Sequence, residues 1–324
     1  MTTPIISVIV PYRNEATAIR SCLASLQAQT EPSFEVLLLD DGSADGSTEI
    51  AENFAREDER FLAVRGSESI GPSARRNQGL EQATGEFVFF ADADDIVLPD
   101  ALGRLLDLAL HTSADTVRGN HVFKFTDGKI ETNTFDQYHQ PEIANIRYAE
   151  MPSLVFLYTS WNMLIRREII LENQLRFEDG LSLGEDRLFT QLVFEASRSI
   201  ALTKAITYHW IRERGSERHL SYNRSLPARL RSVLAYLELF RSLKDATQMH
   251  FEFAQAAMFW ELYDHVISPR SVAGLDVEDQ IRFATIIDML KFDQDLLSDP
   301  SVKGWKEAQA ADAKERYSEL QRMG

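Results

Sequence analysis

The sequence predicts an α/β fold with a mostly parallel central sheet, followed by a helical C-terminal region. Two observations predict this fold class. Over about the first hundred residues, continuous apolar segments alternate with segments of helical spacing, which is typical of βαβ units with a sheet covered on both faces. From about Ser225 onward, the apolar residues keep helical spacing. We therefore expect one domain over residues 1–222 and a helical domain over residues 223–324.

The expected strands of the first part share continuous apolar runs. They are Ile5–Val10, Phe34–Leu39, Phe61–Val64 and Glu86–Ala91. The segments between and after them have apolar residues at helical spacing, and two of these begin with proline, which suits a first helical turn. These helices are Ala16–Gln29, Gly46–Arg56, Pro72–Ala83 and Pro99–His111. Helical crossovers between consecutive strands predict parallel pairing.

The middle of the chain predicts mixed structure, and the end predicts helices. A hairpin is expected from Asp115–Phe125 and Lys129–Thr134 around the Asp127-Gly128 turn. Three short helices and a strand follow, at Leu154–Tyr158, Arg167–Asn173, Glu185–Ala196 and Ser199–Trp210. The C-terminal helices are Leu226–Leu243, Gln248–Val266, Val277–Leu297 and Lys303–Arg322. Five aromatic residues crowd the second of them, Phe251, Phe253, Phe259, Trp260 and Tyr263. Such crowding predicts burial in an intrachain core or in a homo-oligomer formed through these helices.

Composition limits the class of protein. The net charge of −16 argues against nonspecific binding of nucleic acid. Cys22 is the single cysteine, so an internal disulfide and a cysteine zinc site are excluded, and its spacing from Ile19 and Leu26 predicts a core position. The N-terminus lacks a signal-peptide pattern, and no apolar run approaches the ~20 residues of a transmembrane helix. We expect a soluble, cytoplasmic protein, with peripheral association at the inner face of the membrane as an alternative.

Unusual residues follow three of the expected strands, at the carboxyl ends where open parallel sheets bind ligands. They are Pro11-Tyr12-Arg13-Asn14-Glu15, Asp40-Asp41-Gly42-Ser43 and Asp92-Ala93-Asp94-Asp95. If the strand pleat continues through Ala93, the side chains of Asp92 and Asp94 point the same way. Two carboxylates at a sheet edge suit Mn²⁺ or Mg²⁺. A turn that precedes the helix at Pro99 is the alternative.

Charged residues also occupy the first turns of two expected helices. Arg75 and Arg76 lie where a helix N-terminus favours anions, and the planar guanidinium suits a diphosphate; a solvated helix face is the alternative. Glu185 and Asp186 begin another helix, and Asp186 precedes apolar positions by three and seven residues, on the inward stripe. An acid in a first turn commonly complements the helix dipole, but a buried charge needs a reason.

Together these segments resemble the family-two glycosyltransferases of the GT-A fold. The matching segments, in the order that family uses, are SVIVPYRNE, VLLLDDGSADGS, GPSARRNQGL, GEFVFFADADD followed by LPD, WNMLIRRE and GEDRLF. They cover about residues 5–195. The resemblance implies that residues 1–222 form a GT-A catalytic domain that binds a nucleotide sugar.

The resemblance also implies a role for each matching residue. The nucleotide-sugar pocket would be lined by Pro11, Tyr12, Arg13, Glu15, Asp41, Arg76 and Asp92. Asp94 resembles the metal ligand of a D-x-D motif, with Asp92 beside it as second ligand near the ribose, and Asp186 resembles the general base. The acceptor side would be formed by Trp161, Asn162 and Glu185. Two positions depart from the family pattern, since Arg13 replaces an aromatic residue and Met163 replaces a lysine.

The segment Arg212–His219, RERGSERH, follows the last expected strand of the first domain. A pocket that holds a diphosphate beside carboxylates needs cations, so we expect Arg212 and His219 to reach the diphosphate or an acceptor phosphate. A solvated basic loop is the alternative. The stretch YHWIRERGSERHLS, followed by helices, is also loosely similar to soluble wall teichoic acid glycosyltransferases, which implies a glycan or polyol-phosphate acceptor.

The expected function is inverting transfer of a hexosyl or N-acetylhexosaminyl group from a UDP-sugar to a hydroxyl of a cell-surface polymer or glycan precursor. Mn²⁺ or Mg²⁺ is the expected cofactor. A haloacid-dehalogenase-like phosphatase is one alternative, because it also uses D-x-D behind an apolar strand, although it places that strand first. A non-catalytic nucleotide-binding scaffold is the other, and it would bind without turnover.

Overall fold

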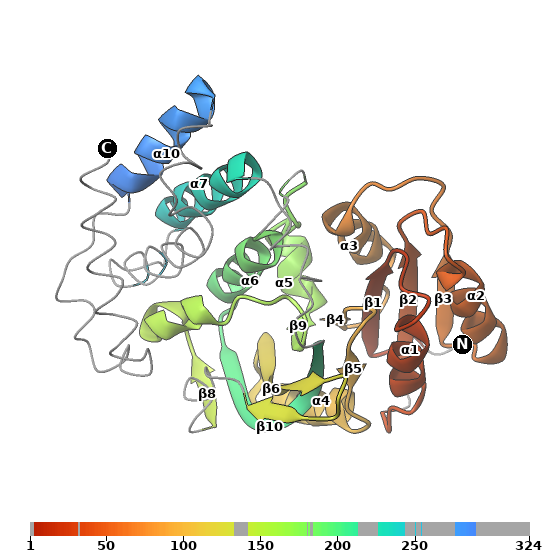
Figure 1. Cartoon of the computed structure of the whole chain (residues 1–324). Coiled ribbons are helices and arrows are strands. Elements are labelled where there is room, and N and C mark those ends of the chain that lie inside the picture. The colour runs from red at the N-terminus through yellow and green to blue at the C-terminus, as the bar shows by residue number, and fades with distance from the viewer. Residues whose placement is uncertain are drawn as a thin grey trace. The chain divides into compact units, whose positions relative to one another are not determined.

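The computed structural model describes residues 3–31, 33–132, 142–179, 181, 184–212, 226–243, 250, 254 and 276–289. The chain divides into two compact units (Figure 1). The first unit comprises Met1–Arg147, Thr159–Gly180 and Leu192–Ser216. The second comprises Tyr148–Tyr158, Leu181–Gln191 and Glu217–Gly324. The expected boundary between residues 222 and 223 lies outside the described residues and stays a prediction.

The alternation expected in the first part of the chain is confirmed. The strands are β1 (Ile6–Tyr12), β2 (Phe34–Asp40), β3 (Phe61–Val64) and β4 (Phe87–Phe90). The helices are α1 (Ile19–Gln27), α2 (Ser47–Glu57), α3 (Pro72–Gln82) and α4 (Ala101–Thr112). Strands β2 and β4 are buried along their whole length, which explains their continuous apolar sequence. Cys22 is buried in the stripe of α1, as predicted.

The rest of the sheet contains both expected and unexpected strands. The hairpin of β6 (Thr116–Phe125) and β7 (Ile130–Thr132) is confirmed, as is the strand β10 (Ile200–Arg212). Three short strands were not predicted, β5 (Ile96–Val97), β8 (Ile143–Ile146) and β9 (Met163–Arg166). Helix α5 (Arg167–Glu172) confirms the helix expected at Arg167–Asn173.

The sheet runs in the order β3-β2-β1-β4-β9-β6-β10-β5. Neighbours among β1, β2, β3 and β4 pair in parallel, and so do β6 and β10. Strand β9 pairs antiparallel with both β4 and β6. Because both of these strands run opposite to β9, β6 runs in the same direction as β4. The carboxyl ends of β1, β2, β4, β6 and β10 therefore open onto one edge of the sheet.

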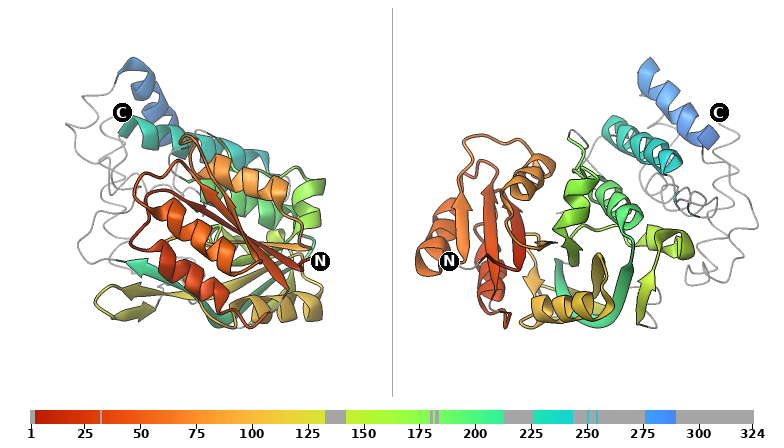
Figure 2. Two further views of the ribbon diagram at one scale, coloured as in Figure 1. Left: turned by 90° about the vertical axis from the view of Figure 1, so that its right-hand side faces the viewer. Right: turned by 180° about the vertical axis from the view of Figure 1, so that it is seen from behind.

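Helices cover both faces of this sheet. Helices α1, α2 and α4 pack on the face formed by Ile6, Val8 and Val10, and the left view of Figure 2 shows α1 and α2 together on that side. Helix α3 packs on the opposite face, against Ile9. A Cβ atom at Gly79 would lie 2.5 Å from Cγ2 of Ile9, so this glycine lets the backbone of α3 approach the sheet closely. Helix α3 thereby brings its charged residues to the open edge.

The second unit is helical in its described residues. Its elements are two 3-10 helices, Tyr148–Glu150 and Pro152–Phe156, the first turns of α6 (Glu185–Ala196), α7 (Leu226–Ser242) and α10 (Val277–Met289). The helix expected at Leu154–Tyr158 is present as a 3-10 helix that begins two residues earlier, at Pro152, and ends at Phe156. Apart from His250 and Ala254, the expected helices Gln248–Val266 and Lys303–Arg322 lie outside the described residues. The proposed oligomer through these helices therefore stays a prediction.

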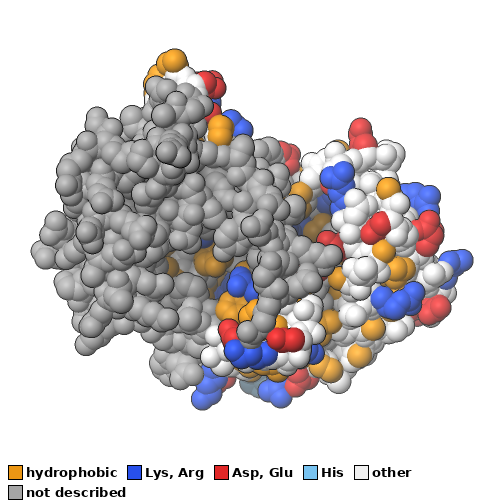
Figure 3. All heavy atoms as spheres, in the orientation of Figure 1, with side chains coloured by type: hydrophobic (Ala, Val, Ile, Leu, Met, Phe, Trp, Pro, Cys, Tyr) orange, Lys and Arg blue, Asp and Glu red, His pale blue; other side chains and the backbone are white. Residues whose placement is uncertain are grey.

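The described part of the surface carries charged side chains of both signs together with hydrophobic ones. On the face of the first unit in Figure 3, basic and acidic side chains lie interspersed. None of the described helices is both long enough and apolar enough to cross a membrane.

Candidate functional site

Hydrogen bonds join the loops that follow β1 and β2. The backbone amide of Asn14 donates to Oγ of Ser43 at 3.1 Å, and Oδ1 of Asn14 accepts from the amide of Ala44 at 2.9 Å. The amide of Glu15 donates to Oγ of Ser47 at 2.8 Å. Asn14 has a φ of 54°, in the left-handed region that asparagine tolerates. The two loops therefore form one fixed surface at the sheet edge.

The residues expected in the first loop differ in exposure. Arg13 is exposed, and Pro11 and Glu15 are half-buried, so all three reach the surface of this edge. Tyr12 is 4% exposed and belongs to the core. Burial and the neighbouring Asp40 carboxylate raise the pKa of Tyr12. The side chain of Tyr12 is enclosed in this structure, and its expected role in binding the donor stays a prediction.

Asp41 forms a closed pair with Arg75. Nε of Arg75 donates to the Asp41 carboxylate at 3.1 Å, and both side chains are 7% exposed. Oγ of Ser69 donates at 2.7 Å, and the backbone amides of Ile70 and Gly71 donate at 2.7 and 3.2 Å. Burial raises the pKa of Asp41, but the hydrogen bonds outweigh burial and hold the pKa below its ordinary value. The pair therefore fixes the chain that leads into α3.

The D-x-D segment is a turn. Strand β4 ends at Phe90, and the amide of Asp95 donates to the carbonyl of Asp92 at 3.2 Å. The condition that the strand pleat continues through Ala93 is therefore not met, because β4 ends at Phe90 and Ala93 lies within the turn. Ala93 is nevertheless buried, Asp92 is half-buried and Asp94 is exposed. The turn thus leaves both carboxylates accessible to solvent.

Asp95 ties this turn to β10. Its buried carboxylate accepts from the hydroxyl of Tyr208 at 2.9 Å and from the amide of Ile211 at 2.8 Å. The same hydroxyl accepts from the amide of Asp92 at 3.1 Å. Burial, together with the charges of Asp94 and Asp92, raises the pKa of Asp95 well above its ordinary value. Tyr208 was not among the expected site residues. An aromatic residue in a strand is common, and its sequence position does not predict a contact with Asp95, 113 residues away.

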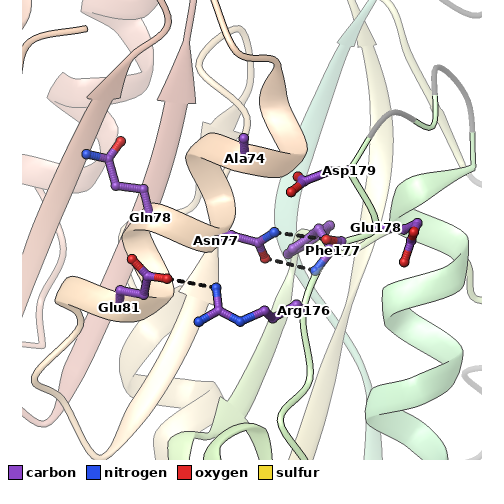
Figure 4. Close-up of a pocket in the computed structure, with 8 residues that line it drawn as sticks. All are labelled: Ala74, Asn77, Gln78, Glu81, Arg176, Phe177, Glu178 and Asp179. Atoms are coloured by element: carbon purple, nitrogen blue, oxygen red, sulfur yellow. Dashed lines mark hydrogen bonds and ion pairs between the residues drawn. The ribbon is translucent and has the colours of Figure 1, made fainter.

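Arg76 joins helix α3 to the turn. Its Nη2 lies 3.0 Å from Oδ1 of Asp92, with side-chain exposures of 6% and 29%. Its guanidinium lies over the ring of Phe177. Asn77 holds the backbone of Phe177, and a shallow pocket of about 430 Å³ adjoins this contact (Figure 4). The solvated helix face that was the alternative for Arg75 and Arg76 is wrong, because both residues are buried.

The turn suits a divalent cation bound through few protein ligands. Asp94 and Asp92 are accessible, whereas Asp95 and Asp41 are enclosed by hydrogen bonds. Among the described residues, no three His, Cys, Asp or Glu side chains gather as a ligand set. Mg²⁺ and Mn²⁺ commonly use one or two carboxylates and complete their shell with water and substrate phosphates. The donor set therefore fits such an ion.

Trp161 and Asn162 are enclosed in the first unit. Trp161 is 2% exposed and stacks on Tyr208, with ring centroids 4.6 Å apart. The Asn162 side chain accepts from Oγ1 of Thr207 at 2.6 Å and donates to the carbonyl of Asn120 at 3.1 Å. Neither side chain forms an open wall in this structure, so their acceptor-side role stays a prediction.

Arg212 ends the described part of the expected basic loop. Its guanidinium carbon lies 4.2 Å from the ring centroid of Trp210 and 4.3 Å from that of Phe123. These rings hold the cation at the carboxyl ends of β6 and β10. His219 lies outside the described residues. The contact of Arg212 and His219 with phosphate stays a prediction.

Helix α6 begins where the sequence predicted. Glu185 and Asp186 lie in its first turn and are half-buried. Gly184 precedes them with a φ of 82°, which glycine adopts readily. Within the second unit, the buried Arg187 lies over the ring of Tyr158 at 4.2 Å and fixes the start of the helix. The roles of Glu185 and Asp186 stay predictions.

Comparisons with known proteins agree with the expected fold. The family model described as Glycosyl transferase family 2 matches residues 7–172. EpsH of Bacillus subtilis, which carries a provisional glycosyltransferase name, is 35% identical over 213 residues, 65% of this chain and 61% of its own length. A poly(ribitol-phosphate) beta-glucosyltransferase of Bacillus spizizenii is 26% identical over 219 residues, 67% of this chain and 33% of its length. The matches thus span less than two thirds of these relatives.

A solved structure resembles nearly the whole chain. The crystal structure of S. aureus TarS 1–349 in complex with UDP-GlcNAc has a TM-score of 0.70 and 20% identity, and the likeness covers 98% of this chain and 89% of that one. At this identity the likeness shows the fold alone. The expected GT-A fold is confirmed.

Proposed function

Since the chain belongs to glycosyl transferase family 2, we propose that it transfers a hexosyl or N-acetylhexosaminyl group from a UDP-sugar to a hydroxyl acceptor, with inversion. One observation carries this proposal. At the common carboxyl edge of the sheet, Arg76 lies 3.0 Å from Asp92, beside the exposed Asp94. A cation fixed beside two accessible carboxylates suits a metal-bound diphosphate.

The residues of this edge bind and orient the donor. Asp94 and Asp92 would hold Mn²⁺ or Mg²⁺, which when bound offsets negative charge on the departing diphosphate as a Lewis acid. Arg76 adds a fixed positive charge that cannot be lost by deprotonation. Pro11, Arg13 and Glu15 would line the nucleotide. The UDP-GlcNAc complex of TarS supports a UDP-sugar as donor.

Asp186 performs the proton transfer in this proposal. Its carboxylate accepts the proton of the acceptor hydroxyl while that oxygen attacks the anomeric carbon. The bond from this carbon to the diphosphate oxygen breaks, and UDP leaves with the electron pair. Attack opposite the leaving group inverts the anomeric centre. Glu185, Trp161 and Asn162 would belong to the acceptor side, and Arg212 and His219 would contact phosphate.

The acceptor is proposed to be a cell-surface polymer or glycan precursor, with a polyol-phosphate chain as one form. The relative named poly(ribitol-phosphate) beta-glucosyltransferase supports this class. A cation at Arg212, beside two aromatic rings, is compatible with a phosphate-bearing acceptor.

A screen of nucleotide sugars tests the proposal. The purified protein is incubated with each donor in Mn²⁺, Mg²⁺ or EDTA, and release of nucleoside diphosphate is measured with and without polyol-phosphate acceptors. We expect metal-dependent release from a UDP-sugar, lost in Asp94→Asn and retained in Asp107→Asn, which changes an exposed aspartate on α4. Hydrolysis of a simple phosphomonoester would instead support the phosphatase, and binding without turnover on any acceptor would support the scaffold.

A further inference from the structure

Phe177 lies between the end of a strand and a cation of the donor edge. Its side chain is 2% exposed and packs edge-on against Phe90, the last residue of β4, with ring centroids 5.2 Å apart. The guanidinium carbon of Arg76 lies 5.2 Å from the Phe177 ring centroid. An arginine guanidinium over an aromatic face gains both electrostatic attraction and flat packing. The ring therefore supports one side of the cation whose Nη2 faces Asp92.

Asn77 fixes the backbone of Phe177. Its Nδ2 donates to the carbonyl of Phe177 at 2.9 Å, and its Oδ1 accepts from the amide of Phe177 at 2.9 Å (Figure 4). These paired bonds are buried and join residues 100 positions apart. Asn77 follows Arg76 directly in α3. One helix therefore carries both the cation and the amide that places the supporting ring under it.

We propose that Phe177, held by Asn77, is the positioning residue that directs the guanidinium of Arg76 toward Asp92 and so sets the affinity of the edge for a metal-bound nucleoside diphosphate. The inference rests on the proposed function of this edge. An arginine side chain has many rotamers, and a ring on one side with a carboxylate on the other restricts them. Such preorganisation favours binding because less side-chain freedom is lost with the ligand.

The test compares Phe177→Leu with Phe54→Leu. Phe54 is a matched control because it is also buried, and its ring packs against Phe61 with centroids 5.8 Å apart, away from the donor edge. Both variants lose an aromatic contact, so both should have a lower melting temperature. In saturating Mn²⁺, calorimetry should show UDP binding weakened about three- to tenfold in Phe177→Leu only, the range that a cation–aromatic contact supports. Equal weakening in both variants, or none in Phe177→Leu, overturns the proposal.

A double-mutant cycle with Arg76→Ala asks whether Phe177 acts through Arg76. If it does, Phe177→Leu causes little further loss of UDP affinity once Arg76 is removed. A full, additive loss would contradict the proposal.

A crystal structure of Phe177→Leu tests the positioning without nucleotide. The expected result is that Arg76 leaves its 3.0 Å contact with Asp92. Retention of that contact overturns the inference. This arm decides the role of Phe177 even if the wild-type protein binds no UDP, an outcome that would refute the proposed function instead.

Discussion

Two consecutive arginines of α3 meet two carboxylates that follow β2 and β4, the strands on either side of β1, and the two pairs differ in how far water reaches the carboxylate. In the Arg75–Asp41 pair both side chains are 7% exposed, and three further groups donate to the carboxylate. In the Arg76–Asp92 pair the arginine is equally buried, but the aspartate side chain is 29% exposed. The first pair is enclosed by its hydrogen bonds, whereas the second presents a carboxylate to solvent beside Asp94.

The difference teaches that two adjacent arginines of one helix can form one enclosed pair and one pair whose carboxylate is open to solvent. Removing one partner of a closed pair leaves a buried charge, which is strongly destabilising. The attraction between Arg76 and Asp92 contributes less to stability, because solvent already screens the half-buried carboxylate of Asp92. The hydrogen bonds of Asp41 and Arg75 support the architecture of the edge. The nucleotide-binding role expected of Asp41 stays a prediction, as do the roles of Asp92 and Arg76 in binding the ligand.

The largest expected effect comes from a substitution that leaves both arginine–aspartate pairs intact. Asp186→Asn should lower the rate of transfer by about 10²–10⁴-fold, because it removes the proposed general base while preserving shape. The affinity for UDP, measured by calorimetry, should stay close to that of the wild type. A parallel loss of UDP affinity and rate would make Asp186 a structural residue.

The next effect separates the two pairs directly. Asp41→Asn should lower the free energy of unfolding by about 3 kcal/mol, because it breaks the closed pair. Asp92→Asn should lower it by about 1 kcal/mol, since water reaches Asp92 and Arg76 keeps the ring of Phe177. Urea denaturation measures both values. Equal losses would remove the distinction between a closed and an open pair.

The smallest effect concerns acid stability. Because the pKa of Asp41 is lower in the folded protein than its ordinary value, its ionised form stabilises the fold at neutral pH. This contribution is fully present above about pH 4, the ordinary range of an aspartate, and is lost as pH falls through the lowered pKa. Asp41→Asn should therefore have a flatter acid limb in melting temperature against pH. An unchanged limb would show that Asp41 does not contribute there.

Local sequence patterns predict the elements of this fold well and the state of its charged residues poorly. Strands β1–β4 follow from their continuous apolar runs and the helices between them from apolar spacing, and α6 begins at Glu185 as the pattern predicts. Strand β9, Met163–Arg166, was missed because it passes directly into α5 at Arg167, with no turn residue to mark its end. Strand β5 was missed because its two residues, Ile96 and Val97, are too few to show a strand pattern.

The candidate site shows the same limit. The sequence predicted Asp92, Asp94 and Arg76 as site residues. It could not show that the carboxylate of Asp41 is enclosed while that of Asp92 is open to solvent. The enclosure of Asp41 depends on hydrogen bonds from Ser69 and Ile70, which lie 28 and 29 residues later in the chain. The contact of Asn77 with Phe177 spans 100 residues, and no local pattern encodes such a contact.

The central claim is that the open edge beside Asp94 is a metal-dependent nucleotide site, and calorimetry of UDP binding tests it most directly. Wild-type protein and Asp94→Asn are each titrated with UDP in Mn²⁺ and in EDTA, after their melting temperatures are shown to agree. We expect wild-type protein to bind UDP tightly only in Mn²⁺, and Asp94→Asn to bind at least about tenfold more weakly, as loss of a metal-site interaction causes. Equal UDP affinity in EDTA, or wild-type affinity in Asp94→Asn, would contradict the claim.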